Sequence, residues 1–204
     1  MSSPQITLYF DIGSPFSYLA FYHLKNSPVF STCRIEYVPV HLKDLFQKCQ
    51  NPPPVLVKNK FLWLQRERLY WALRVGAPVT EKLPDGFPAA TADVQAALAG
   101  LSKESPEKLL LVADRLFNIF WAQGDSSIVK PNRFRAIFEE IVGHKEADVN
   151  QEGLGTSALS ENTQRAFDAG AFGLPWFECT NARGQTKGFW GVDHMDRLVE
   201  HLGL

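Results

Sequence analysis

Cysteine is scarce in this chain of 204 residues, which carries only Cys33, Cys49 and Cys179. No two of them form a C-x-x-C pair, and none has a histidine partner at metal-ligand spacing, so the sequence predicts neither a disulfide framework nor a structural zinc site. The five histidines add no H-E-x-x-H motif. Because Cys33 and Cys179 lie in or beside apolar segments, we expect all three cysteines to be structural and the protein to use no metal.

Excess charge and long apolar segments are missing as well. Lys and Arg total 21 against 22 for Asp and Glu, which leaves a net charge of −1 and no attraction to nucleic acid or anionic lipid. No apolar run approaches the ~18 residues of a membrane span, and residues 1–5 are polar, unlike the start of a signal peptide. We therefore expect an intracellular globular protein with neither nucleic acid nor a membrane as partner.

The first forty residues predict a strand, a helix and a second strand. Residues 6–10 form a short apolar run that ends at Asp11 and Gly13, as a strand followed by a turn does. Ser14-Pro15 is a helix-start signal, because serine accepts a bond from a free backbone N–H and proline is tolerated in the first turn. Residues 34–40 are β-branched, aromatic and apolar enough for the second strand. This order begins a βαβ unit.

The middle of the chain predicts helices only. No segment there alternates apolar and polar residues with period two, and no Ser/Gly-rich linker separates it from its flanks. Helix-start signals and helical spacing of apolar residues recur over roughly a hundred residues. Helices are expected over residues 61–74 and 93–101. Two more are expected to begin at Pro106 and Pro131, and the last covers residues 160–169.

Strand character returns near the C-terminus. Residues 176–180 and 187–190, joined by a turn over 181–184, predict a two-stranded hairpin. Asp193 is expected to cap a last helix whose apolar residues are spaced i, i+3, i+4 and i+7. The complete order is β-α-β, a block of helices, then β-β-α. It predicts an α/β protein with the thioredoxin topology interrupted by a large all-helical insertion.

Several motifs fit this topology. Where thioredoxin-like folds carry a redox C-x-x-C, this chain has Ser14-Pro15-Phe16-Ser17. Residues 170–175 (GAFGLP) are similar to a loop that carries a cis-proline facing the active site, and residues 188–195 (GFWGVDHM) are similar to the turn before the last helix. With the loop at residues 51–53 and Lys60, the chain resembles the kappa-class glutathione transferases and the 2-hydroxychromene-2-carboxylate isomerases from residue 9 to residue 202.

The resemblance implies a division of labour along the chain. Residues 1–42 and 170–204 would form a thioredoxin-like domain that binds glutathione, and residues 43–169 a helical insertion domain with the pocket for a small hydrophobic electrophile. Ser14 would be the catalytic residue, donating a hydrogen bond to the thiolate. The glutathione contacts implied are Asn51 and Lys60 at the glycyl end, Leu174 and a cis Pro175 at the cysteine, and Val192 and Asp193 at the γ-glutamyl group. Pro15 and Phe16 are implied as further contacts.

The same resemblance implies a homodimer and a kappa-type transferase that adds the glutathione thiolate to small electrophiles. One alternative is a glutathione-dependent cis-trans isomerase that uses Ser14 identically; another is a non-catalytic thioredoxin-like protein that holds glutathione or a peptide. A disulfide oxidoreductase is the least favoured class, because both redox positions are serines. We expect a cytoplasmic location, with mitochondria and peroxisomes as alternatives, although the last four residues are not a peroxisomal S-K-L signal.

Each motif also has an ordinary structural interpretation. Ser14-Pro15 alone is a helix start, as Ser105-Pro106 is, and Asp193 alone is a helix cap. Lys60 alone is a solvated lysine. Most X-Pro bonds are trans, so only the resemblance predicts a cis Pro175. Position favours function at Ser14, which follows a strand at the carboxyl edge of a sheet, where α/β folds place their ligands.

Overall fold

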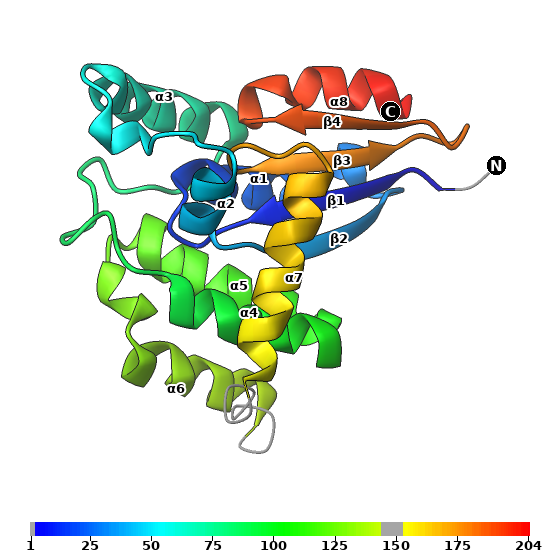
Figure 1. Ribbon diagram of the computed structural model, residues 1–204. Coiled ribbons are helices and arrows are strands. Elements are labelled where there is room, and N and C mark those ends of the chain that lie inside the picture. Colours follow the sequence, from blue (N-terminus) through cyan, green and yellow to red (C-terminus); the bar gives the residue numbers. More distant parts are fainter. Residues whose placement is uncertain (1–2, 144–152) are drawn as a thin grey trace.

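The four predicted strands form one sheet in the order β2-β1-β3-β4 in the computed structural model, which describes residues 3–143 and 153–204 (Figure 1). Strand β1 (Gln5–Phe10) pairs in parallel with β2 (Arg34–Pro39) and antiparallel with β3 (Trp176–Thr180), which forms a hairpin with β4 (Thr186–Trp190). The βαβ unit and the C-terminal hairpin predicted from the sequence are thus confirmed.

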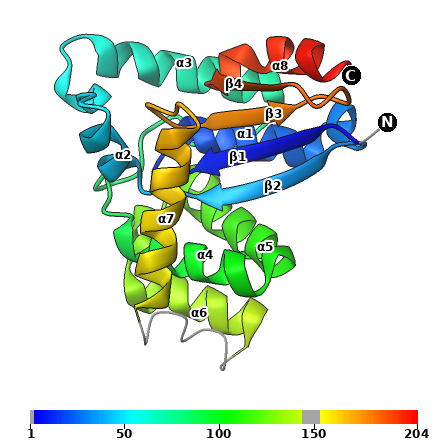
Figure 2. The same ribbon diagram turned by 45° about the vertical axis from the view of Figure 1, so that its right-hand side comes forward.

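Helices cover both faces of this sheet (Figures 1 and 2). Helices α1 (Pro15–Asn26) and α8 (Met195–Leu202) bury their apolar residues in the core on one face. Helices α2 (Leu42–Lys48) and α7 (Leu154–Asp168) pack on the other face, where Leu45 and Ala166 join Tyr9 and Trp176 in a second cluster. The strands are therefore buried on both sides where they approach the carboxyl end of β1.

The helical insertion consists of α3 (Lys60–Val75), α4 (Ala92–Glu104), α5 (Pro106–Phe117) and α6 (Pro131–Val142), besides α2 and α7. Helix α4 is its centre, with every residue from 94 to 101 buried. The ring of Phe117 on α5 lies 5.7 Å from that of Phe10 on β1 and 5.2 Å from that of Phe21 on α1. Sheet and insertion thus share one hydrophobic core.

Some predicted boundaries were wrong. Helix α2 was not predicted, α7 begins at Leu154 instead of residue 160, and Asp193 lies inside a short 3-10 turn without making a capping hydrogen bond. No helix of the described residues is long and apolar enough to cross a membrane. Short 3-10 turns lie at Pro28–Phe30, Pro54–Leu56, Ser126–Val129 and Val192–His194, and a π-helical turn lies at Asn118–Ala122.

Candidate active site

Ser14 stands at the start of α1, four residues after the end of β1. It is 4% exposed, and its Oγ accepts a hydrogen bond from the Ser17 N–H at 3.2 Å, so the predicted cap is present. Pro15 has no N–H, and the Phe16 N–H makes no hydrogen bond within the part of the chain that the structure describes. The first turn of α1 therefore offers one free donor, and the positive end of the helix dipole, beside the Ser14 hydroxyl.

The Leu174–Pro175 loop faces this serine. The peptide bond before Pro175 is cis, as the resemblance predicted. The Ser14 hydroxyl donates to the Leu174 carbonyl at 3.3 Å, and the Gly191 N–H donates to the Pro175 carbonyl at 3.1 Å. The Leu174 N–H has no partner among the described residues. This short stretch of backbone is therefore open to an extended ligand next to Ser14.

The 3-10 turn Val192–His194 follows directly on that contact and packs against α1. Gly191 has a φ of 83°, a backbone conformation that is strained for residues with a side chain, so this turn favours glycine. Val192 is buried, whereas Asp193 is exposed, with its Oδ1 3.4 Å from Nδ1 of His194. The turn carries an accessible carboxylate at the same end of α1 as Ser14.

Asn51 and Lys60 lie differently from one another. The Asn51 amide donates to the Phe172 carbonyl at 2.8 Å, which ties the loop before Leu174 to the segment after α2. Lys60 is half-buried at the first position of α3; its backbone N–H donates to the Val57 carbonyl at 3.2 Å, whereas its side chain makes no hydrogen bond or ion pair within the described residues. The structure thus brings together Ser14, Leu174 and the 192–193 turn, links Asn51 to them through its loop, and leaves Lys60 without a contact to them.

Asp11 is a buried carboxylate that the sequence analysis treated only as the end of a strand. One oxygen accepts from the Gly13 N–H at 2.8 Å; the other accepts from the Leu42 N–H at 2.9 Å and from the Thr91 hydroxyl at 3.1 Å. Burial raises the pKa of this carboxyl above its usual value, against the opposing effect of these hydrogen bonds. The spacing of Asp11 and Gly13 can be recognised in the sequence as a turn. The contacts of Asp11 with Leu42 and Thr91 produce no such pattern in the sequence, so they could not be predicted.

The three cysteines lie away from the Ser14 turn. Burial raises the pKa of all three thiols, most of all that of Cys179 in the core. Cys49 donates to the Ala171 carbonyl at 3.3 Å. A thiol whose pKa is raised is a poor nucleophile, which agrees with structural roles. No group of three or more His, Cys, Asp or Glu that could hold a metal occurs among the described residues.

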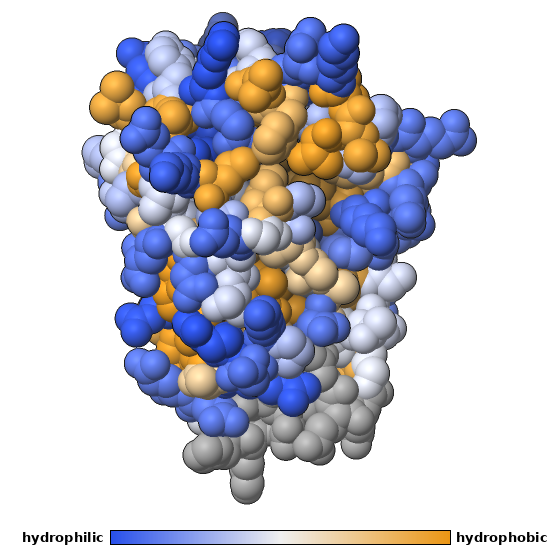
Figure 3. All heavy atoms as spheres, turned by 90° about the vertical axis from the view of Figure 1, so that its left-hand side faces the viewer, coloured by the Kyte–Doolittle hydropathy of each residue, from blue (hydrophilic) through white to orange (hydrophobic). Residues whose placement is uncertain are grey.

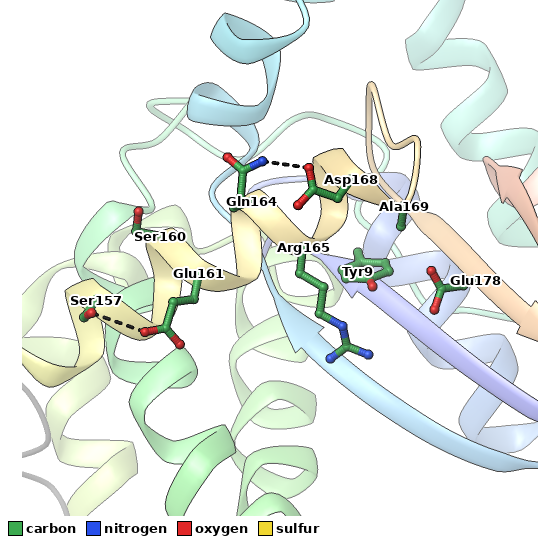
Figure 4. Close-up of a pocket in the computed structure, with 9 residues that line it drawn as sticks. All are labelled: Tyr9, Ser157, Ser160, Glu161, Gln164, Arg165, Asp168, Ala169 and Glu178. Atoms are coloured by element: carbon green, nitrogen blue, oxygen red, sulfur yellow. Dashed lines mark hydrogen bonds between the residues drawn. The ribbon is translucent and has the colours of Figure 1, made fainter.

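A crevice of about 750 Å³ lies between α7 and the sheet, on the face of the sheet opposite α1 (Figure 4). None of the predicted site residues lines it. Its walls are Tyr9, Ser157, Ser160, Glu161, Gln164, Arg165, Asp168, Ala169 and Glu178. The Arg165 side chain that crosses it is paired with both carboxylate oxygens of Glu36 at 2.7 Å, which leaves the crevice predominantly acidic.

Comparisons with known proteins identify the fold family of this chain. A family model described as DSBA-like thioredoxin domain matches residues 5–203. Glutathione S-transferase kappa 1 of Caenorhabditis elegans is 24% identical over 209 residues, which cover 98% of this chain and 91% of that protein. The 2-hydroxychromene-2-carboxylate isomerase of Sphingobium xenophagum is 26% identical over 206 residues, covering 97% of each chain.

A solved structure of a 2-hydroxychromene-2-carboxylate isomerase superposes with a TM-score of 0.80 at 21% identity, covering 98% of this chain and 94% of that chain. Its likeness extends over the sheet and the helical insertion together, which confirms the predicted thioredoxin-like fold. With a family model that spans nearly its whole length, this chain belongs to the DsbA-like thioredoxin-domain family.

Proposed function

We propose that this protein is a glutathione transferase of the kappa type, in which Ser14 stabilises the glutathione thiolate for addition to a small electrophile. The observation that carries the proposal is the pairing of the Ser14 hydroxyl, at the start of α1, with the backbone of Leu174 beside a cis proline. Both redox positions are serines, so the reactive sulfur must come with the ligand. The relatives named glutathione S-transferase kappa 1 and 2-hydroxychromene-2-carboxylate isomerase, both similar over nearly the whole chain, support this class of chemistry.

Binding begins with an exchange of hydrogen bonds. The Leu174 carbonyl holds the Ser14 hydroxyl in the free protein. When the cysteinyl N–H of glutathione pairs with that carbonyl, and the Leu174 N–H pairs with the cysteinyl carbonyl, the serine hydroxyl is released toward the sulfur. The hydroxyl then donates to the thiolate, with the free Phe16 N–H close by.

Two interactions at the start of α1 lower the pKa of the bound glutathione thiol. A hydrogen bond to a charged group contributes about 1.5–3 kcal/mol and a helix N-terminus about 0.3–1. At ~1.4 kcal/mol per pKa unit, together they lower the pKa of the bound thiol by roughly 1.5–3 units. The thiol would then be largely ionised near neutral pH, and the thiolate is the form that attacks an electrophile.

The remainder of the tripeptide fits the groups around this pair. The N–H groups of Val192 and Asp193 donate to the γ-glutamyl carboxylate, and the exposed Asp193 carboxylate accepts hydrogen bonds from the γ-glutamyl ammonium. Lys60 holds the glycyl carboxylate. Asn51 acts through the loop whose Phe172 carbonyl it already holds, because that bond fixes the approach to Leu174. Pro15 and Phe16 form the floor beneath the thiol.

Hydrophobic side chains gather on the upper half of the end of the molecule toward which β1 and β2 run (Figure 3). The large exposed apolar residues on elements at this end include Leu56, Leu62, Trp63 and Phe172. Such a surface suits a small apolar electrophile better than a charged one.

The proposal also includes the homodimer that the resemblance implies. Light scattering of the purified protein tests this oligomeric state.

One paired assay tests the function. The purified protein is given glutathione with a chlorodinitrobenzene, to measure conjugate formation, and with an unsaturated aromatic keto acid, to measure isomerisation. Conjugation with stoichiometric loss of glutathione supports the transferase. Isomerisation that needs glutathione but does not consume it identifies the isomerase, the second candidate because of the 0.80 superposition. Glutathione binding with neither reaction would leave only a binding protein.

A further inference from the structure

We infer that Trp121 and Gln95, two buried residues of the helical insertion, are positioning residues that hold the Ser14 turn in its reactive geometry. The inference rests on the proposed function for its catalytic consequence, but its structural part concerns the turn alone. Neither side chain was a candidate from the sequence. Gln95 lies 83 positions, and Trp121 109 positions, from Ile12, the residue that both contact.

Both side chains act on Ile12, the residue between Asp11 and Gly13. The Ile12 N–H donates to Oε1 of Gln95 at 3.3 Å, and the Ile12 carbonyl accepts from the Trp121 indole N–H at 2.8 Å. Gln95 and Trp121 are both completely buried, so water does not compete for these bonds. The backbone of one residue is thus held on both sides by the insertion.

Gln95 does more than cap one N–H. Its amide nitrogen also donates to the Phe10 carbonyl at 2.9 Å and to the Val40 carbonyl at 2.8 Å, where β1 and the segment after β2 end. Both amide hydrogens and the amide oxygen are therefore used. A buried amide is tolerated in an apolar helix only when such partners satisfy it. Its bonds link the carboxyl ends of two parallel strands to the turn.

Trp121 reaches Ile12 from the π-helical turn Asn118–Ala122, which continues α5. Its ring packs 4.7 Å from that of Phe120 and 5.6 Å from that of Phe87, so the indole has little freedom to move. π-helical turns inside α-helices often occur at functional sites. Here the extra residue of the turn directs the indole N–H at the backbone before Ser14.

These contacts complete a continuous set of bonds up to the serine. The Gly13 N–H is held by the Asp11 carboxylate at 2.8 Å, and the Ser14 N–H by the Asp11 carbonyl at 3.0 Å. Every N–H from Ile12 to Ser14 therefore has a fixed acceptor. Without the Trp121 bond, the peptide after Ile12 is held only through its Gly13 N–H, so it tilts more freely and the Ser14 hydroxyl moves relative to the Leu174 carbonyl. A displacement of an ångström at a reacting group costs on the order of a hundredfold in rate.

The test is Trp121→Phe, which keeps an aromatic ring and removes only the donor, with Trp71→Phe as the matched control. Trp71 is a half-buried tryptophan of α3 that packs edge-on against Tyr70 and has no hydrogen bond to the turn. In folded Trp121→Phe we expect amide hydrogen exchange at residues 12–14 about tenfold faster. The bound thiol pKa should rise by about one unit, and kcat should fall about tenfold with KM for glutathione within about twofold.

Gln95→Met provides a second variant should the first not fold, and it should change the same quantities. Unchanged exchange, thiol pKa and kcat in either folded variant, or an equal change in Trp71→Phe, would overturn the inference. If the wild-type protein shows neither a bound thiolate nor conjugation, the proposed function fails; the exchange rates of residues 12–14 then still decide whether Trp121 and Gln95 position the turn.

Discussion

Replacing Ser14 by alanine removes a hydroxyl that makes two hydrogen bonds in the free protein, one to Leu174 and one from the Ser17 N–H. Loss of the cap costs about 1 kcal/mol of folding stability, and loss of the bond to the carbonyl about 0.5–1.5. Ser105→Ala is the matched control, because Ser105 also precedes a proline at a helix start, that of α5, but its side chain makes no capping bond.

The larger effect of Ser14→Ala concerns the bound thiol. With Ser14 only 4% exposed, its bond to the thiolate is shielded from water, and its loss removes about 1.5–3 kcal/mol. At ~1.4 kcal/mol per unit, the thiol pKa rises by about one to two units, and conjugation below that pKa falls about 10- to 100-fold. Affinity for glutathione falls little, because Leu174 and the 192–193 turn keep their contacts.

The assay is the ultraviolet absorbance of the thiolate of bound glutathione, titrated against pH in the wild type, Ser14→Ala and Ser105→Ala. Circular dichroism and urea unfolding establish that each protein is folded. The two controls should titrate together, with Ser14→Ala displaced to higher pH. Coincident curves for all three folded proteins would refute the reasoning and leave Ser14 a helix cap alone.

Three further predictions follow from the same geometry. Replacing all three cysteines by serine should leave the rate of conjugation within about threefold of wild type, because burial raises the pKa of each thiol. A larger loss in a folded protein would show that a cysteine of the protein, and not glutathione, supplies the nucleophile. Since burial raises the pKa of folded Asp11 above its usual 3.8, the wild type should lose stability relative to Asp11→Asn as pH rises through that folded pKa; urea midpoints at several pH values from about 4 to 8 measure this, and a constant difference would contradict it. Asn51→Ala removes the bond to Phe172 and should raise KM for glutathione about tenfold with little change in thiol pKa, whereas an altered pKa with normal KM would show that its role was misassigned.

The sequence predicted the strands and the Ser14 turn because their signals are local: an apolar run, a turn and a helix start. Helix α2 escaped because it has seven residues and buries only Leu45. Helix α4 continues to Glu104, beyond the predicted end at residue 101, and because residues 94–101 are all buried it lacks the amphipathic pattern that marks the extent of a surface helix. Asp193 was misplaced as the cap because the positive φ of Gly191 starts a 3-10 turn before α8.

The residues of the candidate site that belong to the family motifs could be predicted from the sequence. The residues that support them from elsewhere in the chain could not. Ser14 and Leu174 meet as the resemblance implied. The hydrogen bonds between Thr91 and Asp11 and between Ile12 and Gln95 join residues 80 and 83 positions apart, and no spacing rule in a single sequence links such pairs. The contact of Asn51 with Phe172 could not be predicted for the same reason, because these residues are far apart in the sequence and meet only in the folded chain.

The aromatic contact between β1 and α5 limits how this protein can diversify. Any change in the size of Phe117 acts on Phe10, and so on the strand that delivers the serine turn, because the rings are only 5.7 Å apart. Leu73 on α3, by contrast, is 84% exposed and free to vary. Substitutions on the exposed surface of the insertion can therefore alter substrate preference without disturbing the sheet. Exchanging the whole insertion between relatives would also require matching changes in the side chains of the sheet that pack against it.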